Sequence, residues 1–296
     1  MTAPAPALKI AERGHPNTAT EGRHTPLTAQ QTDGPQPRAP FYEALAAALA
    51  RRGLDLADFC PQGDCVAARV LEEYGAMFLA EGVELPSVCI FETGEAVRRF
   101  QEGAGWSTEE VGGATIELQP RAMKALLEAR EEALAAGLDI TPRGGVEAAR
   151  RSFEDSLRLW RSRCDPALEH WCASGSLAAE EAERVRGLPL REQVAAVLEL
   201  ERGGLFFSKC FAKSILQSVA APGASQHLAM LAFDALQFRD PRVREIFGRR
   251  GWFQTVRSDL PHFTYLGLPE RELPARGLRP VEEYGQQFWV PDIGRG

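Results

Sequence analysis

The chain has 296 residues, of which 44% are hydrophobic and 25% charged, a composition typical of globular proteins with a sizeable core. The net charge of −7 disfavours binding to nucleic acid or to anionic membranes, because both need basic surface. No apolar run approaches the roughly 20 residues that span a bilayer. We therefore expect neither a nucleic-acid partner nor a membrane span.

Residues 1–40 differ from the rest of the chain. They hold seven of the 20 prolines and no aromatic residue, and they show no periodicity. Such a segment buries too little apolar surface to offset its ordering entropy, so it is predicted to be a disordered tail. Residues 1–20 contain no continuous apolar segment, and no secretory signal peptide is visible.

Residues 41–110 are predicted to be a mainly helical N-terminal region. Apolar residues recur at helical spacing, and Gly53 and Gly103 follow two of the stretches. The predicted elements are helices over 41–51, 64–81 and 96–101 and a short strand over 88–91.

Residues 111–296 mix short strands with longer helices. Pro120 opens a helix, since proline is well tolerated in a first turn, and Gly137 ends it. The predicted elements are strands over 115–118 and 138–141 and helices over 120–136, 147–161 and 190–201. The second strand leads into a turn that carries Arg143. Arg150 and Arg151 could contact a carboxylate, but they are interpreted as part of a solvated helix face.

Two short constellations carry the candidate chemistry. In the first, a turn presents Ser225 and His227, and the apolar run that follows ends in Asp234. A carboxylate within an apolar run needs a partner, because an unpaired buried charge is costly, and a metal ion is one such partner. In the second, Asp259 precedes His262 by three residues, at the start of an aromatic-rich strand pattern.

Two histidines and one carboxylate form a three-ligand set with an open fourth position, the arrangement of catalytic zinc. His227, Asp234 and His262 are the candidate ligands, and Asp259 is the candidate general base. Two alternatives stay open from spacing alone. The histidines and aspartates could be ordinary structural residues. Ser225 could instead be a nucleophile with His227 as its base, although the Gly-x-Ser-x-Gly pattern is missing.

The order of these residues resembles the zinc D-alanyl-D-alanine carboxypeptidases of the VanY type, which are related to endolysins that cut L-alanyl-D-glutamate bonds. The family pattern is Ser-x-His-x-x-Gly-x-Ala-x-Asp, followed by Glu or Asp-x-x-His. The matching positions are Ser225, His227, Ala232, Asp234, Asp259 and His262. The resemblance covers about residues 111–268, and it is weaker at Arg143, which stands in the turn where the family has an arginine.

Three positions depart from the family pattern. Met230 replaces a glycine, Pro261 replaces a tryptophan, and Asp259 replaces the glutamate of the carboxypeptidases. Aspartate is the residue of the endolysin branch, so a general base is retained. The first two departures motivate an alternative in which the chain keeps the fold as a non-catalytic module that binds cell-wall peptides.

The resemblance implies an α+β fold of the hedgehog/DD-peptidase type, with a small, mainly antiparallel sheet and helices packed on one face. It implies a zinc peptidase acting on peptidoglycan stem peptides, with D-alanyl-D-alanine carboxypeptidase as the first expectation and an endopeptidase as the alternative. Arg143 would stabilise the oxyanion or hold a substrate carboxylate, beside Ser225 as a second substrate contact. Such an enzyme is expected in the cell envelope or periplasm. There the near pairs Cys60–Cys65 and Cys164–Cys172 would be disulfides or free thiols.

Overall fold

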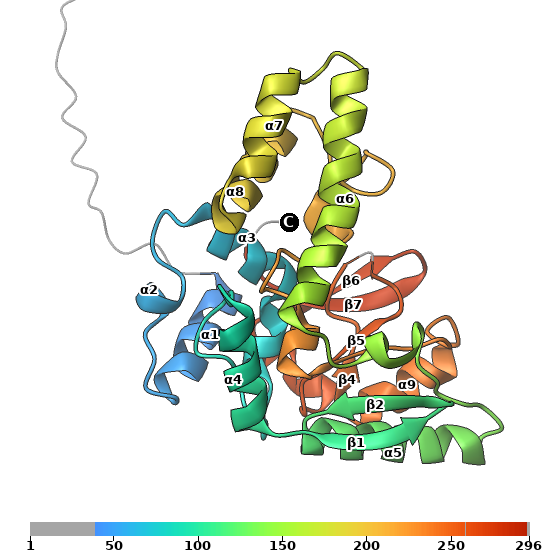
Figure 1. The fold of residues 1–296 in the computed structure, drawn as a ribbon. Coiled ribbons are helices and arrows are strands. Elements are labelled where there is room, and N and C mark those ends of the chain that lie inside the picture. Colours follow the sequence, from blue (N-terminus) through green and yellow to red (C-terminus); the bar gives the residue numbers. More distant parts are fainter. Residues whose placement is uncertain (1–38, 258, 295–296) are drawn as a thin grey trace, which may run out of the picture. The chain divides into compact units, whose positions relative to one another are not determined.

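The computed structural model describes residues 39–257 and 259–294, and it combines helices with short antiparallel strands (Figure 1). The expected α+β class is confirmed. The helices are α1 (Pro40–Ala50), α2 (Leu56–Phe59), α3 (Cys65–Tyr74), α4 (Gly94–Ala104), α5 (Pro120–Ala135), α6 (Phe153–Ala173), α7 (Ala179–Gly187), α8 (Leu190–Arg202) and α9 (Pro241–Arg249). The strands are β1 (Ser107–Val111), β2 (Ala114–Leu118), β3 (Ala232–Asp234), β4 (Trp252–Phe253), β5 (His262–Tyr265), β6 (Leu278–Glu283) and β7 (Gln286–Pro291).

The strands of the described residues form three small antiparallel sheets where one was expected. Strands β1 and β2 pair, β5 lies between β3 and β4, and β6 pairs with β7. In the central sheet, the register sets Asp234 opposite His262. The pairing of β3 with β5 therefore brings together two candidate ligands that are 28 residues apart in sequence.

Two predicted strands do not form. Residues 88–90 form a bend. Residues 138–141 form no strand and lead into an isolated bridge between Pro142 and Ala235. The apolar side chains of Cys89 and Ile140 are buried, so their hydrophobicity serves the core without a strand partner. Short apolar runs do not by themselves distinguish a strand from a buried loop.

The helix expected over 147–161 is interrupted. A short 3₁₀ helix, η2 (Gly145–Ala148), is followed by a break, and α6 then begins at Phe153. Ser152 caps α6 in a capping box: its Oγ accepts from the Asp155 amide at 3.1 Å, and the Asp155 carboxylate accepts from the Ser152 amide at 2.9 Å. This cap fixes the start of α6 at Phe153, so Arg151 lies within the break between η2 and α6.

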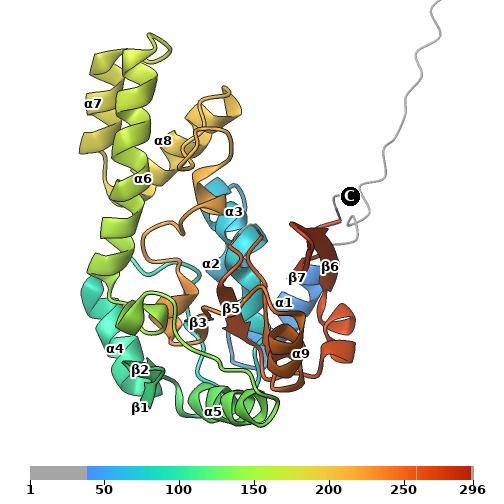
Figure 2. The ribbon, with the colours of Figure 1, turned by 90° about the vertical axis from the view of Figure 1, so that its right-hand side faces the viewer.

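The two larger of three hydrophobic clusters form most of the interior of the described residues. The larger includes Phe41 and Leu71 from the N-terminal helices together with Phe233 and Phe247, so it joins residues on both sides of position 110. The second contains Trp160 and other buried residues of α6, α7 and α8. These three helices stand side by side in Figures 1 and 2. Residues 38–296 form one compact unit. The tail predicted for residues 1–40 lies outside the described residues, apart from Ala39 and Pro40.

None of the described helices is long and apolar enough to cross a membrane.

Candidate metal centre

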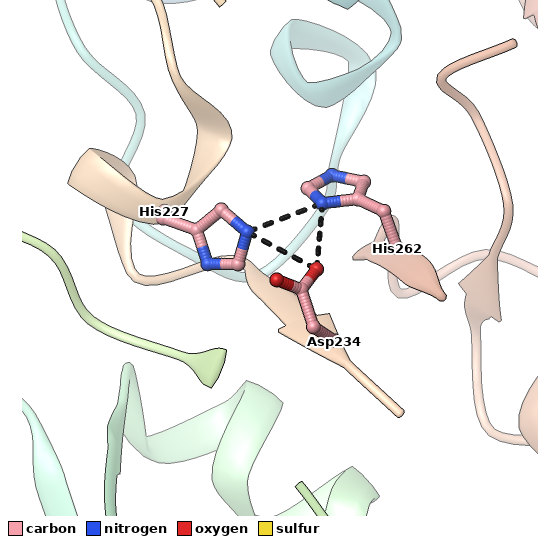
Figure 3. A group of neighbouring side chains, drawn as sticks. All are labelled: His227, Asp234 and His262. Atoms are coloured by element: carbon pink, nitrogen blue, oxygen red, sulfur yellow. Dashed lines mark hydrogen bonds and ion pairs between the residues drawn. The ribbon is translucent and has the colours of Figure 1, made fainter. Parts of the chain in front are cut away.

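Three separate elements position the candidate ligands. His227 lies on a 3₁₀ turn, η4 (Gln226–Ala229), Asp234 ends β3, and His262 begins β5 (Figure 3). The two imidazole side chains are 2% and 5% exposed, and the Asp234 side chain is 14% exposed. The site is therefore nearly closed to solvent and rests on the rigid central sheet.

The three ligand atoms form an almost equilateral triangle. His227 Nε2 lies 3.3 Å from Asp234 Oδ1 and 3.2 Å from His262 Nδ1, and His262 Nδ1 lies 3.2 Å from Asp234 Oδ1. A tetrahedral zinc ion with bonds of about 2.0–2.1 Å places its ligand atoms about 3.3–3.4 Å apart. The triangle therefore has the dimensions of one face of a zinc coordination tetrahedron, and the residues present fit a metal ion.

The outer nitrogen of each imidazole has an oxygen partner. His227 Nδ1 lies 2.6 Å from the carbonyl oxygen of Ala149, and His262 Nε2 lies 2.8 Å from Oε1 of Gln226. Because oxygens of carbonyl groups only accept hydrogen bonds, these outer nitrogens carry the protons of the neutral rings. The inner nitrogens are then bare, and two nitrogen lone pairs and a carboxylate oxygen converge on one point. Metal-binding histidines commonly have such outer partners.

Electrostatics agree with this protonation. Burial, reinforced by the charge of Arg151, lowers the pKa of His227 to about 4, so the ring is neutral at neutral pH. The guanidinium of Arg151, 2.6 Å from Asp234 Oδ2, favours the ionised form of that carboxylate. Neutral imidazole and ionised carboxylate are the forms that bind metals.

Arg151 contacts the carboxylate of Asp234, a contact that the sequence left open as the less favoured alternative. Its Nη2 donates to Asp234 Oδ2 at 2.6 Å, and its Nε donates to the Glu147 carbonyl oxygen at 2.8 Å. The interpretation of Arg151 as part of a solvated helix face is wrong, because the break before α6 turns it toward the site. Holding Oδ2 leaves Oδ1 as the atom that faces the histidines. An arginine next to a helix start gave no sequence signal for this contact.

A cavity of about 130 Å³ adjoins the triangle, and Asp259 and Ser225 are part of its wall. Burial raises the pKa of Asp259, although the positive charges around it act in the opposite direction. Among the described residues, no side chain hydrogen-bonds or pairs with the Asp259 carboxylate. The other lining residues are Tyr74, Arg151, Ser156, Leu159, Arg163, Ser218, Val219, Ala220, Gln226, His227, Asp234 and His262.

Arg143 is not among the residues that line this cavity, although its charge acts on Asp259 in the cavity wall. Its amide donates to the carbonyl oxygen of Asp234 at 2.8 Å, and its guanidinium lies over the ring of Phe238. The turn that carries Arg143 therefore anchors the end of β3 through its backbone. The cationic side chains on the cavity wall are instead Arg151 and Arg163, both contributed by the segment around α6.

The two family departures near the ligands have different consequences. Met230 has φ of 56° and ψ of 34°, a left-handed conformation that glycine adopts most readily. The chain therefore keeps a glycine-like turn at a cost of about 1–2 kcal/mol, and the fully buried Met230 side chain offsets this cost. Pro261 begins the approach to β5, and its carbonyl oxygen accepts from the Ala235 amide at 2.8 Å.

All six cysteines are free thiols, so neither Cys60–Cys65 nor Cys164–Cys172 is bridged.

Comparison of the chain with protein-family models and with curated proteins gives no match. The site is therefore interpreted from its own geometry and from the motif resemblance.

Proposed function

We propose that this protein is a zinc-dependent peptidase that hydrolyses peptidoglycan stem peptides, acting as a D-alanyl-D-alanine carboxypeptidase. The observation that carries the proposal is the convergence of three bare ligand atoms, from His227, Asp234 and His262, beside the carboxylate of Asp259 in one enclosed cavity. The motif resemblance supplies the substrate class. When bound at these residues, zinc polarises a carbonyl group and makes water more acidic.

Asp259 is the proton acceptor in this mechanism. Its carboxylate lies on the wall of the cavity that holds the ligand atoms, and its raised pKa suits a group that takes a proton from water and passes it to the leaving amine. The Asp259 carbonyl oxygen also accepts from the His262 amide at 3.1 Å, which fixes the loop between them.

Arg163 favours a carboxypeptidase over an endopeptidase. Its guanidinium has no carboxylate partner within the described residues: Nε donates to Ser218 Oγ at 3.0 Å, and Nη1 donates to Ser162. A substrate with a free carboxylate next to the scissile bond would supply the missing anion. We assign this role to Arg163 in place of Arg143, and Ser225 remains a proposed substrate contact on the same wall.

The alternatives each have a distinguishing observation. An endopeptidase is favoured by aspartate at position 259, as in the endolysin branch. A binding module is less supported than the sequence suggested, since Met230 retains the glycine-like turn. A serine hydrolase is disfavoured because both ring nitrogens of His227 contact groups other than Ser225.

Metal analysis combined with digestion of a synthetic stem pentapeptide tests the proposal. The zinc-loaded protein should release free D-alanine, as read by mass spectrometry, and a chelator should abolish the reaction. His227→Ala should lose zinc and activity. His170→Ala is the matched control, because that ring stacks on Phe211 outside the cavity, and it should retain both.

The outcomes separate the candidate functions. Cleavage at the L-alanyl-D-glutamate bond would identify the endopeptidase. A folded, zinc-loaded protein that leaves the peptide intact would point to the binding module. Hydrolysis by metal-free protein that resists chelation would contradict the zinc mechanism and favour Ser225.

A further inference from the structure

Gln226 is a buried amide that contacts the candidate metal centre through His262. It precedes His227 in sequence, contacts His262 in space, and is 1% exposed. The motif pattern leaves this position unspecified. A fully buried amide must satisfy its donors and its acceptor with particular partners, because no solvent reaches it.

The backbone fixes which way the Gln226 amide faces. Nε2 donates to the carbonyl oxygen of Tyr74 at 2.9 Å. If the amide were turned over, its oxygen would face that carbonyl oxygen with no hydrogen between them, and a buried acceptor would be left unsatisfied. The Tyr74 carbonyl therefore directs Oε1 of Gln226 toward His262.

Two threonines reinforce this orientation. Nε2 of Gln226 lies 3.5 Å from Thr255 Oγ1, the two threonine hydroxyls are 2.6 Å apart, and Thr264 Oγ1 donates to Gln226 Oε1. Each threonine hydroxyl can accept a hydrogen bond from one neighbour and donate one to the next. The bonds then run in a single direction around a closed ring, from Gln226 Nε2 to Thr255, from Thr255 to Thr264, and from Thr264 back to Gln226 Oε1. Both threonine side chains are fully buried, so no solvent competes for these bonds.

The orientation determines the tautomer of His262. Oε1 lies 2.8 Å from His262 Nε2 and can only accept, so the neutral ring carries its proton on Nε2. Nδ1 is then bare, 3.2 Å from Asp234 Oδ1. Without an acceptor at Nε2, the ring would favour a proton on Nδ1, donated to the Asp234 carboxylate. That arrangement would fill the ligand position with a hydrogen bond.

We propose that Gln226 is a positioning residue that selects the Nε2–H tautomer of His262 and so keeps Nδ1 available to a metal ion. The proposal rests on the metal site proposed above, but the tautomer exists in the metal-free protein and can be measured there. Loss of an outer partner of a metal ligand typically weakens metal binding by about 10–100-fold.

The test combines nitrogen NMR of the metal-free protein with zinc titration. In the wild-type protein, the histidine ring nitrogens should show the proton of His262 on Nε2. Gln226→Met, which keeps the volume but removes the acceptor, should shift the proton toward Nδ1 and weaken zinc binding about 10–100-fold. Gln226→Glu retains an oxygen that can face His262 but loses the donor to the Tyr74 carbonyl oxygen, so it should keep the proton on Nε2 of His262 at a cost in stability.

Gln193→Met is the matched control. Gln193 is also a buried amide, accepting from Trp160 Nε1 at 2.8 Å and donating to the Val185 carbonyl oxygen at 3.1 Å, within the α6–α8 cluster. Its loss should lower stability without changing the His262 tautomer or the zinc affinity. This separates the proposed role from the general cost of removing a buried amide.

A proton on Nδ1 of His262 in the metal-free wild-type protein would overturn the proposal, even if Gln226→Met failed to fold. Wild-type tautomer and affinity in a folded Gln226→Met protein would overturn it equally. If the wild-type protein shows the expected tautomer but binds no zinc, the metal function fails and the tautomer assignment stands.

Discussion

At the scale of single residues, the candidate site consists of groups whose protonation is set by their neighbours. Carbonyl oxygens hold the outer nitrogens of both histidines, and Arg151 holds one oxygen of Asp234. Asp259 differs from these groups because no such partner holds its carboxylate among the described residues. The site thus combines three fixed atoms that could hold a metal ion with one carboxylate that no described side chain pairs.

Replacing Asp259 by asparagine tests the proposed base. Asn has nearly the same size, so the fold and the zinc content should be retained, while hydrolysis should fall by about 10²–10⁴-fold. Zinc stoichiometry, melting temperature and turnover should be measured on one preparation. A folded, zinc-loaded Asp259→Asn protein with wild-type turnover would refute the mechanism, and loss of zinc would make Asp259 a ligand.

The lowered pKa of His227 predicts an acid-sensitive fold. Between about pH 6.5 and 4, His227 of the unfolded chain takes up a proton and that of the folded, metal-free protein does not. The free energy of unfolding should therefore fall as the pH drops through this window, by up to about 3 kcal/mol.

Denaturant titrations of metal-free protein at several pH values measure this effect. His227→Gln should lose this part of the pH dependence, since the amide does not titrate, while His170→Gln should keep it. If the free energy of unfolding changed equally with pH in wild-type protein and in His227→Gln, the lowered pKa of His227 would be contradicted.

At the scale of elements, the break between η2 and α6 is what places cationic side chains at the site. The capping box of Ser152 and Asp155 begins α6 two residues after Arg151, and Arg163 lies further along the same helix on the cavity wall. In an uninterrupted helix over 147–161, the side chains would project at helical spacing. The backbone would then not turn the Arg151 side chain toward Asp234. A helix start therefore contributes directly to the geometry of the site.

Ser152→Ala tests the contribution of this cap. Losing the Oγ acceptor at a helix N-cap typically costs about 1 kcal/mol, within about 0.5–2 kcal/mol, in free energy of unfolding. Ser174→Ala, at the exposed C-terminal end of the same helix, should cost much less. Chemical denaturation of both variants compares them. Equal stabilities would show that the cap has no net effect.

At the scale of the whole molecule, one core connects segments from the two ends of the described chain. The Phe41 amide donates to the Asp292 carbonyl oxygen at 3.0 Å, and the Phe41 side chain is fully buried in the cluster that also contains Phe233. The central sheet that carries the ligands therefore shares its core with α1. The N-terminal helices thus support the site through common packing.

Deleting the residues that precede this core should affect stability far less than removing one side chain from the core. Deleting residues 1–38 should change the melting temperature little, because their proline-rich composition buries little apolar surface. Phe41→Ala should instead cost about 3–5 kcal/mol through lost burial and the cavity that remains. A fall of many degrees on deletion of residues 1–38 would show that this segment packs on the rest of the protein.

Local features of the sequence were enough to predict several parts of the structure. Pro120 marked the start of α5, and apolar periodicity gave α3 and α8, because these signals depend only on neighbouring residues. The group of His227, Asp234 and His262, which could hold a metal ion, was also predicted, since an aspartate in an apolar run and two scarce histidines are unusual wherever they fold. The predicted strand over 138–141 failed because strand formation needs a partner from elsewhere in the chain.

The tertiary structure alone decided how these residues work together. The register of β3 and β5 sets the spacing of the ligand atoms, and it depends on pairing between segments 28 residues apart. Arg151 and Gln226 meet the ligands through contacts at sequence separations of 83 and 36, for which no local pattern exists. The sequence by itself therefore determined which side chains could bind a metal. Their protonation, their partners and the cavity beside them follow from long-range packing, because each depends on atoms that only the folded chain brings within hydrogen-bonding distance.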